Sequence, residues 1–157
     1  DGGPCESGLE STIIDCTGDI ARLLRPGGIT RDALAAALAT ANCNPQIDMA
    51  EPLADSENPV APGQLASHYA PNAPVRLMAN TSAADEELIG FGAVSGAGKL
   101  ALNLSPSADL VEAAANLFSM LHAVDTADIA KIAIAPIPDI GLGEAINDRL
   151  RRAAAPR

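Results

Sequence analysis

The sequence predicts an α/β fold in which a mostly parallel sheet is flanked by helices, preceded by a linker and a small α/β segment. From residue 74 onward, short apolar runs rich in branched residues alternate with stretches of helical periodicity. Such alternation is typical of a parallel sheet covered by helices. Aromatic residues make up only 2% of the chain, so we expect a core of Ala, Leu, Ile and Val, which suits close packing of helices on a sheet.

The first forty residues carry the signals of a hairpin followed by a helix. Residues 10–16 alternate in polarity and contain a β-branched trio, which predicts a strand. A Gly-Asp turn signal at residues 18–19 separates it from a partner strand at 21–24. Thr30 is placed to cap a helix over residues 31–39, with Asp32 in the first turn.

Residues 41–73 differ in composition from both flanking regions. Asn, Pro, Asp, Ser and Gly cluster there, prolines recur at positions 45, 52, 59, 62 and 71, and little periodicity remains. Because proline fixes φ and disfavours helix at the residue before it, we expect a partly extended linker between two domains.

The last part of the chain supplies the alternation of strands and helices. Strands are predicted at 75–79, 88–93, 100–104 and 129–135, with a helical turn at 82–87. Ser105 as N-cap and Pro106 at the first helical position open a helix over residues 106–124, which has an apolar stripe. A final helix over 144–155 ends in three cations near the negative end of its dipole, Arg149, Arg151 and Arg152.

Charge and composition exclude several classes of protein. The net charge is −10 and the pI is about 4.4, and so acidic a surface argues against direct nucleic-acid binding, although a few arginines suffice for a nucleotide pocket. The three cysteines form no CxxC pair, so neither a disulfide framework nor a structural zinc site is expected. No apolar run approaches membrane-spanning length and nothing reads as a signal peptide, so a cytoplasmic location is the expectation.

Three short strings carry most of the functional information. They are ESTIID at residues 10–15, LRPGGIT at 24–30, and APGQ with SHYAP at 61–64 and 67–71. A glycine-rich lead at residues 2–9 precedes the first string, and glycines let backbone approach a ligand closely. In this order the strings resemble the end of the catalytic domain and the following linker of threonylcarbamoyl-AMP synthases.

The resemblance implies three segments. Residues 1–40 would be the C-terminal remnant of a YrdC-like catalytic domain, 41–73 a Pro-rich interdomain linker, and 74–157 a Rossmann-like C-terminal domain. Because the first string begins almost at residue 1, we expect most of a catalytic domain to lie upstream and this chain alone to be inactive. The family's full enzyme is a nucleotidyltransferase that makes threonylcarbamoyl-AMP and pyrophosphate from L-threonine, bicarbonate (or CO₂) and ATP, for threonylcarbamoyladenosine modification of tRNA.

Ser11, Arg25 and Tyr69 are the candidate binding residues, and no catalytic residue or metal ligand is predicted. On the residues alone, Ser11 sits on an ordinary strand and Arg25 suits either bidentate phosphate binding or a surface salt bridge. Tyr69 suits either a nucleotide lid or a hydrophobic anchor for the linker. By the resemblance, Ser11 holds L-threonine, and Arg25 and Tyr69 contact ATP. Arg22, outside the motif, is the alternative cation.

ATP is the expected nucleotide substrate, with Mg²⁺, although no carboxylate cluster in the sequence reads as a set of metal ligands. The other expected partners are L-threonine, bicarbonate or CO₂, and a downstream threonylcarbamoyl transferase. The alternative function is non-catalytic: a Rossmann-like regulatory or partner-docking module over residues 74–157. An NAD-type dehydrogenase is excluded because Ile146 occupies the third glycine position of the fingerprint that Gly141 and Gly143 begin.

Overall fold

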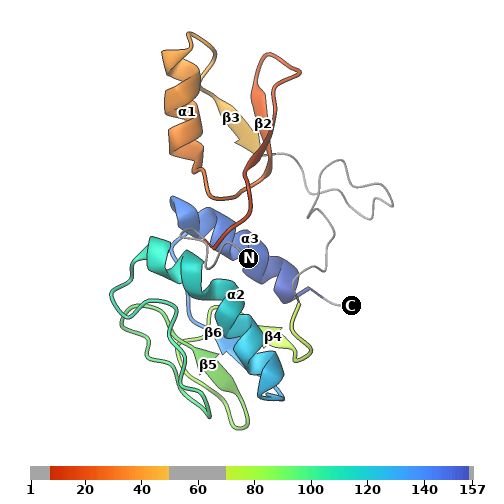
Figure 1. The fold of residues 1–157 in the computed structure, drawn as a ribbon, viewed down its shortest axis with the longest axis vertical. Helices are drawn as coiled ribbons and strands as arrows, with labels where there is room; N and C mark the ends of the chain where they lie inside the picture. Colours follow the sequence, from red (N-terminus) through yellow and green to blue (C-terminus); the bar gives the residue numbers. More distant parts are fainter. Residues whose placement is uncertain (1–7, 50–69, 156–157) are drawn as a thin grey trace, which may run out of the picture.

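The computed structural model describes residues 8–49 and 70–155, and these form two units (Figure 1). We call residues 8–49 the N-terminal unit and residues 70–155 the C-terminal unit. Each unit contains a three-stranded sheet. The strand order is β1 (Ile13–Asp15), β2 (Ala21–Arg25), β3 (Ile47–Met49) in the first sheet and β4 (Val75–Arg76), β6 (Ile132–Ile134), β5 (Glu87–Ile89) in the second. The predicted α/β class is confirmed, and the sheet of the C-terminal unit is parallel throughout.

The N-terminal unit is a hairpin, a helix and a third strand. Its elements are β1 (Ile13–Asp15), β2 (Ala21–Arg25), α1 (Arg31–Thr40) and β3 (Ile47–Met49). β1 pairs antiparallel with β2, which confirms the predicted hairpin. α1 begins where predicted because the Thr30 side chain accepts a hydrogen bond from the backbone N of Ala33 (3.3 Å), the geometry of an N-cap.

β3 lies inside the segment predicted to be a linker. It pairs parallel with β2, and its first residue, Ile47, is buried in a small cluster with Ala21 and Leu23. One buried side chain in three residues leaves almost no period-2 signal in the sequence. The strand exists because β2 offers it an edge, and the predicted domain boundaries at residues 40 and 73 remain a prediction.

The C-terminal unit packs two helices on one face of its sheet. Its elements are β4 (Val75–Arg76), β5 (Glu87–Ile89), α2 (Leu110–Thr126), β6 (Ile132–Ile134) and α3 (Leu142–Ala153). In the central strand, Ile132 and Ile134 join the main hydrophobic cluster with side chains of α2 and α3, whereas Ala133 packs on the other side with Ala79 and Leu88. The predicted helices therefore cover one face, and a loop region covers the other.

Three element predictions for this unit are wrong. Residues 82–87 form no helical turn, because Asp85 adopts φ +60° and the Glu86 side chain bonds the backbone of Ala83. Residues 100–104 form only an isolated bridge at Asn103. α2 starts at residue 110 rather than 106, because Ala108 adopts φ +60° and Asp109 caps the helix instead of Ser105.

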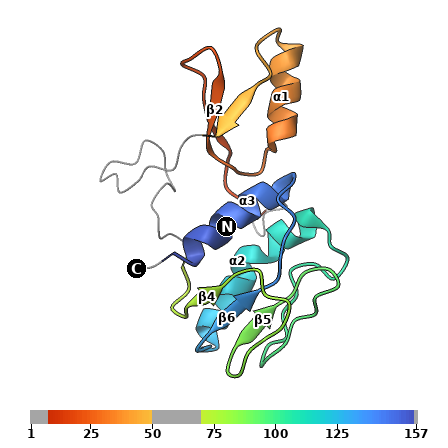
Figure 2. The same cartoon turned by 180° about the vertical axis from the view of Figure 1, so that it is seen from behind.

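α3 lies between the N-terminal unit and the sheet of the C-terminal unit in both views of the ribbon (Figures 1 and 2). Two ion pairs join α3 to the N-terminal unit, Arg31 with Glu144 and Glu10 with Arg149. The N-terminal unit is thus held on α3 through charged groups. Among the described residues, no helix is long and apolar enough to cross a membrane.

Candidate functional site

An arginine and a serine form the centre of the site. Arg25 is the last residue of β2, and Ser11 lies two residues before β1. The Arg25 guanidinium donates to the Ser11 carbonyl from Nε (3.1 Å) and Nη2 (2.9 Å), and Nη2 also donates to Ser11 Oγ (3.1 Å). Arg25 is only 7% exposed, whereas Ser11 is exposed. The structure therefore brings together two of the three predicted site residues.

The turn after Arg25 is fastened to the segment around Ser11. Gly28 N donates to the Glu10 carbonyl (2.9 Å), and Thr12 Oγ1 both donates to the Ile29 carbonyl (2.7 Å) and accepts from Ile29 N (3.0 Å). A side chain on Gly27 would place its Cβ 2.4 Å from the Glu10 carbonyl oxygen and 2.5 Å from Thr12 N. The two segments approach so closely that only glycine fits there. The first two sequence strings therefore form one structural piece.

Arg22, the alternative cation, points elsewhere. Its Nη2 donates to Asp15 Oδ2 at 2.6 Å near the turn of the hairpin, and its side chain is 59% exposed. Hydrogen bonds from the Thr17 hydroxyl and backbone N, together with that from Arg22, lower the pKa of Asp15 to about 2. Arg22 therefore belongs to an exposed salt bridge, and Arg25 is the cation beside Ser11.

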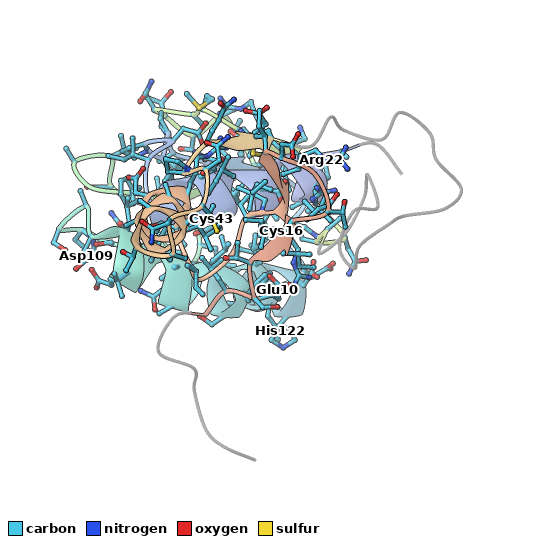
Figure 3. All side chains as sticks on the ribbon, turned by 90° about the horizontal axis from the view of Figure 1, so that it is seen from above. Glu10, Cys16, Arg22, Cys43, Asp109 and His122 are labelled. Atoms are coloured by element: carbon cyan, nitrogen blue, oxygen red, sulfur yellow. The ribbon has the colours of Figure 1, made fainter. Side chains whose placement is uncertain are left out.

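A buried arginine of α3 contacts the same two segments. Arg149, 1% exposed, donates from Nε to Glu10 Oε2 (2.8 Å) and from Nη2 to the Pro26 carbonyl (3.1 Å). Its Nη1 donates to Asp148 Oδ2 (2.5 Å). Glu10, labelled in Figure 3, belongs to the N-terminal unit and forms its ion pair with Arg149 of α3. The prediction that Arg149 complements the helix dipole near the end of α3 is incomplete, because its guanidinium is buried at the junction.

The third predicted residue, Tyr69, lies outside the described residues. The chain that follows it is held against the ends of the two long helices. Asn72 N donates to Asp125 Oδ1 in α2 (2.7 Å), Pro71 is buried, and residues 70–75 line a cavity of about 290 Å³ together with residues 153–155. The chain is therefore packed against the two helices from Pro71 onward.

The site suits an anion that can accept hydrogen bonds. The Ser11 hydroxyl accepts from a guanidinium, so its own proton is directed away from Arg25 and can be donated to a ligand. The charge of Arg25 next to it favours a carboxylate or a phosphate. Within residues 8–49 and 70–155, no three His, Cys, Asp or Glu side chains come together in a group that would hold a metal ion. Mg²⁺ bound with ATP is held mainly by the phosphates and by one or two carboxylates, and its presence here stays a prediction.

Sequence reasoning missed the residues that support this pair. Arg149 falls among the buried positions of α3, which include Ala145, Ile146, Leu150 and Ala153. An arginine within an apolar helical stripe is a signal of a paired buried charge, since isolated charges are almost never buried. Glu10 and Thr12 gave no comparable signal, because their partners are far away in sequence.

Fold and site together define an α/β protein in which a buried arginine contacts an exposed serine beside a unit with a parallel sheet. A family model described as the C-terminal domain of threonylcarbamoyl-AMP synthase matches residues 29–155. The threonylcarbamoyl-AMP synthase of Bacillus subtilis is 34% identical and that of Pyrococcus abyssi 30% identical, over 100% of this chain. The chain belongs to the threonylcarbamoyl-AMP synthase family, and it spans 48% and 49% of the length of these two relatives.

Two solved structures of the archaeal relative share the fold. The crystal structure of P. abyssi Sua5 complexed with L-threonine matches with a TM-score of 0.73 and 28% identity, over 98% of this chain and 48% of that one. A variant of the same protein, with a histidine and the adjacent tyrosine replaced by alanine, matches with a TM-score of 0.72 and 25% identity, over 98% of this chain and 47% of that one.

Proposed function

We propose that this chain is the C-terminal part of an L-threonylcarbamoyladenylate synthase. The full enzyme would join L-threonine, bicarbonate or CO₂ and ATP into threonylcarbamoyl-AMP and pyrophosphate, for use by a transferase that modifies tRNA. The observation that carries the proposal is the contact of Arg25 with Ser11, in a chain that belongs to this family. The relative solved with L-threonine supports threonine as the amino-acid substrate.

The residues have distinct roles in this proposal. The Ser11 hydroxyl donates to the threonine substrate, and Arg25, fixed by the Ser11 carbonyl, neutralises phosphate charge of ATP. Catalysis is then mainly positioning and charge neutralisation, since an anionic amino acid derivative must approach the α-phosphate. Tyr69 follows His68 and closes the nucleotide pocket. The solved variant of the archaeal relative concerns the same two residue types in the same order.

The test is pyrophosphate release by the full-length gene product from ATP and bicarbonate, with and without L-threonine. We expect release to depend on threonine, and Arg25→Ala to lower kcat/KM on the order of 10²-fold, as loss of one charge-stabilising donor does elsewhere. Arg22→Ala removes an exposed arginine outside the site and serves as the matched control, with unchanged activity.

Ser11→Ala separates the two substrates. Losing one hydrogen bond to a charged group should raise the KM for threonine about tenfold or more while leaving the KM for ATP nearly unchanged. No threonine-dependent release from a folded full-length protein would reject the synthase and favour the non-catalytic module. Because this chain spans about half the length of its relatives, we expect the 157-residue chain alone to release no pyrophosphate.

A further inference from the structure

Arg149 makes contacts that neither helix capping nor solubility requires. Among the described residues it has the largest side chain that is almost fully buried, at 1% exposure, and its three nitrogens donate to Glu10, Asp148 and Pro26. A buried guanidinium is tolerated only when its hydrogen-bond donors are satisfied. Here Glu10 and Pro26 are acceptors from more than a hundred positions away in the sequence.

The two distant acceptors adjoin the proposed binding residues. Glu10 precedes Ser11 directly, and Pro26 follows Arg25 directly. The same guanidinium therefore holds the segment on either side of the Arg25–Ser11 contact. A planar fork can hold a carboxylate and a carbonyl at fixed angles, which a lysine ammonium cannot do. Arg149 thereby fixes the distance between the segment at residues 10–12 and the turn at Gly27. These two segments already lie too close together for a Cβ at Gly27.

We propose that Arg149 is a positioning residue through which the C-terminal unit holds the Ser11–Arg25 pair in its binding geometry. As a role in catalysis this inference rests on the proposed function, but the positioning itself concerns this chain alone. It gives the C-terminal unit a defined role, because α3 completes the support of a site whose ligand-facing residues lie in the N-terminal unit.

Hydrogen exchange of the 157-residue chain tests the positioning directly. The amides of Gly28 and Ile29, bonded to Glu10 and Thr12, report on the fastened turn, and the amide of Ile132 in β6 reports on the core. In Arg149→Met we expect Gly28 and Ile29 to exchange about tenfold faster or more, the factor that one charge-assisted hydrogen bond is worth, while Ile132 is unchanged.

The matched control is Arg151→Met, which makes the same substitution at an exposed position of the same helix and should change none of these rates. Equal acceleration at all three amides, or none, would overturn the proposal. If Arg149→Met does not fold, Glu10→Gln removes the charged acceptor while keeping the arginine, and should accelerate Gly28 and Ile29 selectively.

Kinetics of the full-length gene product test the consequence for binding. Arg149→Met should raise the KM for both threonine and ATP about tenfold, with a smaller change in kcat. A lower kcat at unchanged KM would mean only a smaller folded fraction and would count against positioning. If the wild type shows no threonine-dependent release, the proposed function fails, and the exchange experiment still decides whether Arg149 holds the pair.

Discussion

Glu86 is a carboxylate kept ionised by its neighbours. It accepts from Arg76 Nε (3.0 Å) and Nη2 (2.6 Å) and from Ala83 N (2.8 Å), and the residue is 9% exposed. The hydrogen bonds from Arg76 first, and then that from Ala83, lower the pKa of Glu86 from its ordinary 4.5 to about 2. The carboxylate also closes the turn at Asp85, which precedes β5.

This lowered pKa makes the stability of the chain depend on pH in a defined window. Because the folded-state pKa lies below the unfolded one, the contribution is fully present above pH 4.5 and is lost as pH falls toward 2. Glu86→Gln should flatten the fall in the free energy of unfolding across this window, measured by urea titration at a series of pH values. Arg76→Met should do the same, since it removes the main cause. A wild-type slope in both variants would contradict this assignment.

The turn at Gly27 lies very close to residues 10–12, the segment that leads into β1. A Cβ at Gly27 would overlap three backbone atoms of residues 10–12 at 2.4 to 2.6 Å. Backbone atoms cannot rotate away as the end of a side chain can, so the two segments would have to separate. The hydrogen bonds of Gly28 and Ile29 depend on the same approach.

Gly27→Ala should therefore destabilise the chain by about 1–3 kcal/mol, the usual cost of forced overpacking. Urea unfolding of the variant measures this. Gly18→Ala is the matched control: its Cβ would meet only the Ile20 carbonyl at 3.8 Å, an ordinary contact, so its stability should not fall. Equal stability of the two variants would show that the turn has room after all.

The elements could be predicted from the sequence where periodicity is long, and not where a single local feature decides. Three signals were sufficient to predict an element: the apolar stripe for α2, the apolar run for β6 and the Thr30 cap for α1. The start of α2 was not, because Ala108 adopts φ +60°, a conformation that alanine gives no reason to expect. β3 is short and has no strand pattern of its own. It forms because it can pair with the edge of β2.

The candidate site follows the same division. Ser11 and Arg25 could each be found from its own string, but their direct contact depends on the hairpin register and the turn at Gly27. Arg149 lies 139 residues from Glu10, so only the packing of α3 against the N-terminal unit reveals it. The roles of Ser11, Arg25 and Tyr69 in binding remain predictions.

At the scale of the whole molecule, the two units differ in the cores that stabilise them. The cluster of the N-terminal unit contains three buried residues, Ala21, Leu23 and Ile47, and no residue of α1 is buried. The main cluster of the C-terminal unit draws buried side chains from β5, β6, α2 and α3. Regions with few buried apolar contacts open at lower free energy than the rest.

Exchange measured at increasing denaturant should therefore find two opening units. Amides of β2 and α1 should share a lower free energy of opening than those of α2 and β6. Arg31→Met, which removes the ion pair with Glu144, should lower the first value further and leave the second unchanged. A single common value for all four elements would show that the chain opens as one unit.

The contacts of Arg149 should restrict amino-acid substitution differently at its two distant partners, Glu10 and Pro26. It binds Glu10 through the side chain but Pro26 only through the main-chain carbonyl, which every amino acid possesses. Replacement of the acid at position 10 would remove the carboxylate that accepts from Nε of a buried guanidinium, so we expect positions 10 and 149 to change together among homologous sequences. Position 26 is under no such pressure from Arg149, and any restriction on it must come from the bend that proline gives the turn. The Arg149 guanidinium thus makes substitutions at position 149 depend on the residue at position 10, 139 positions earlier.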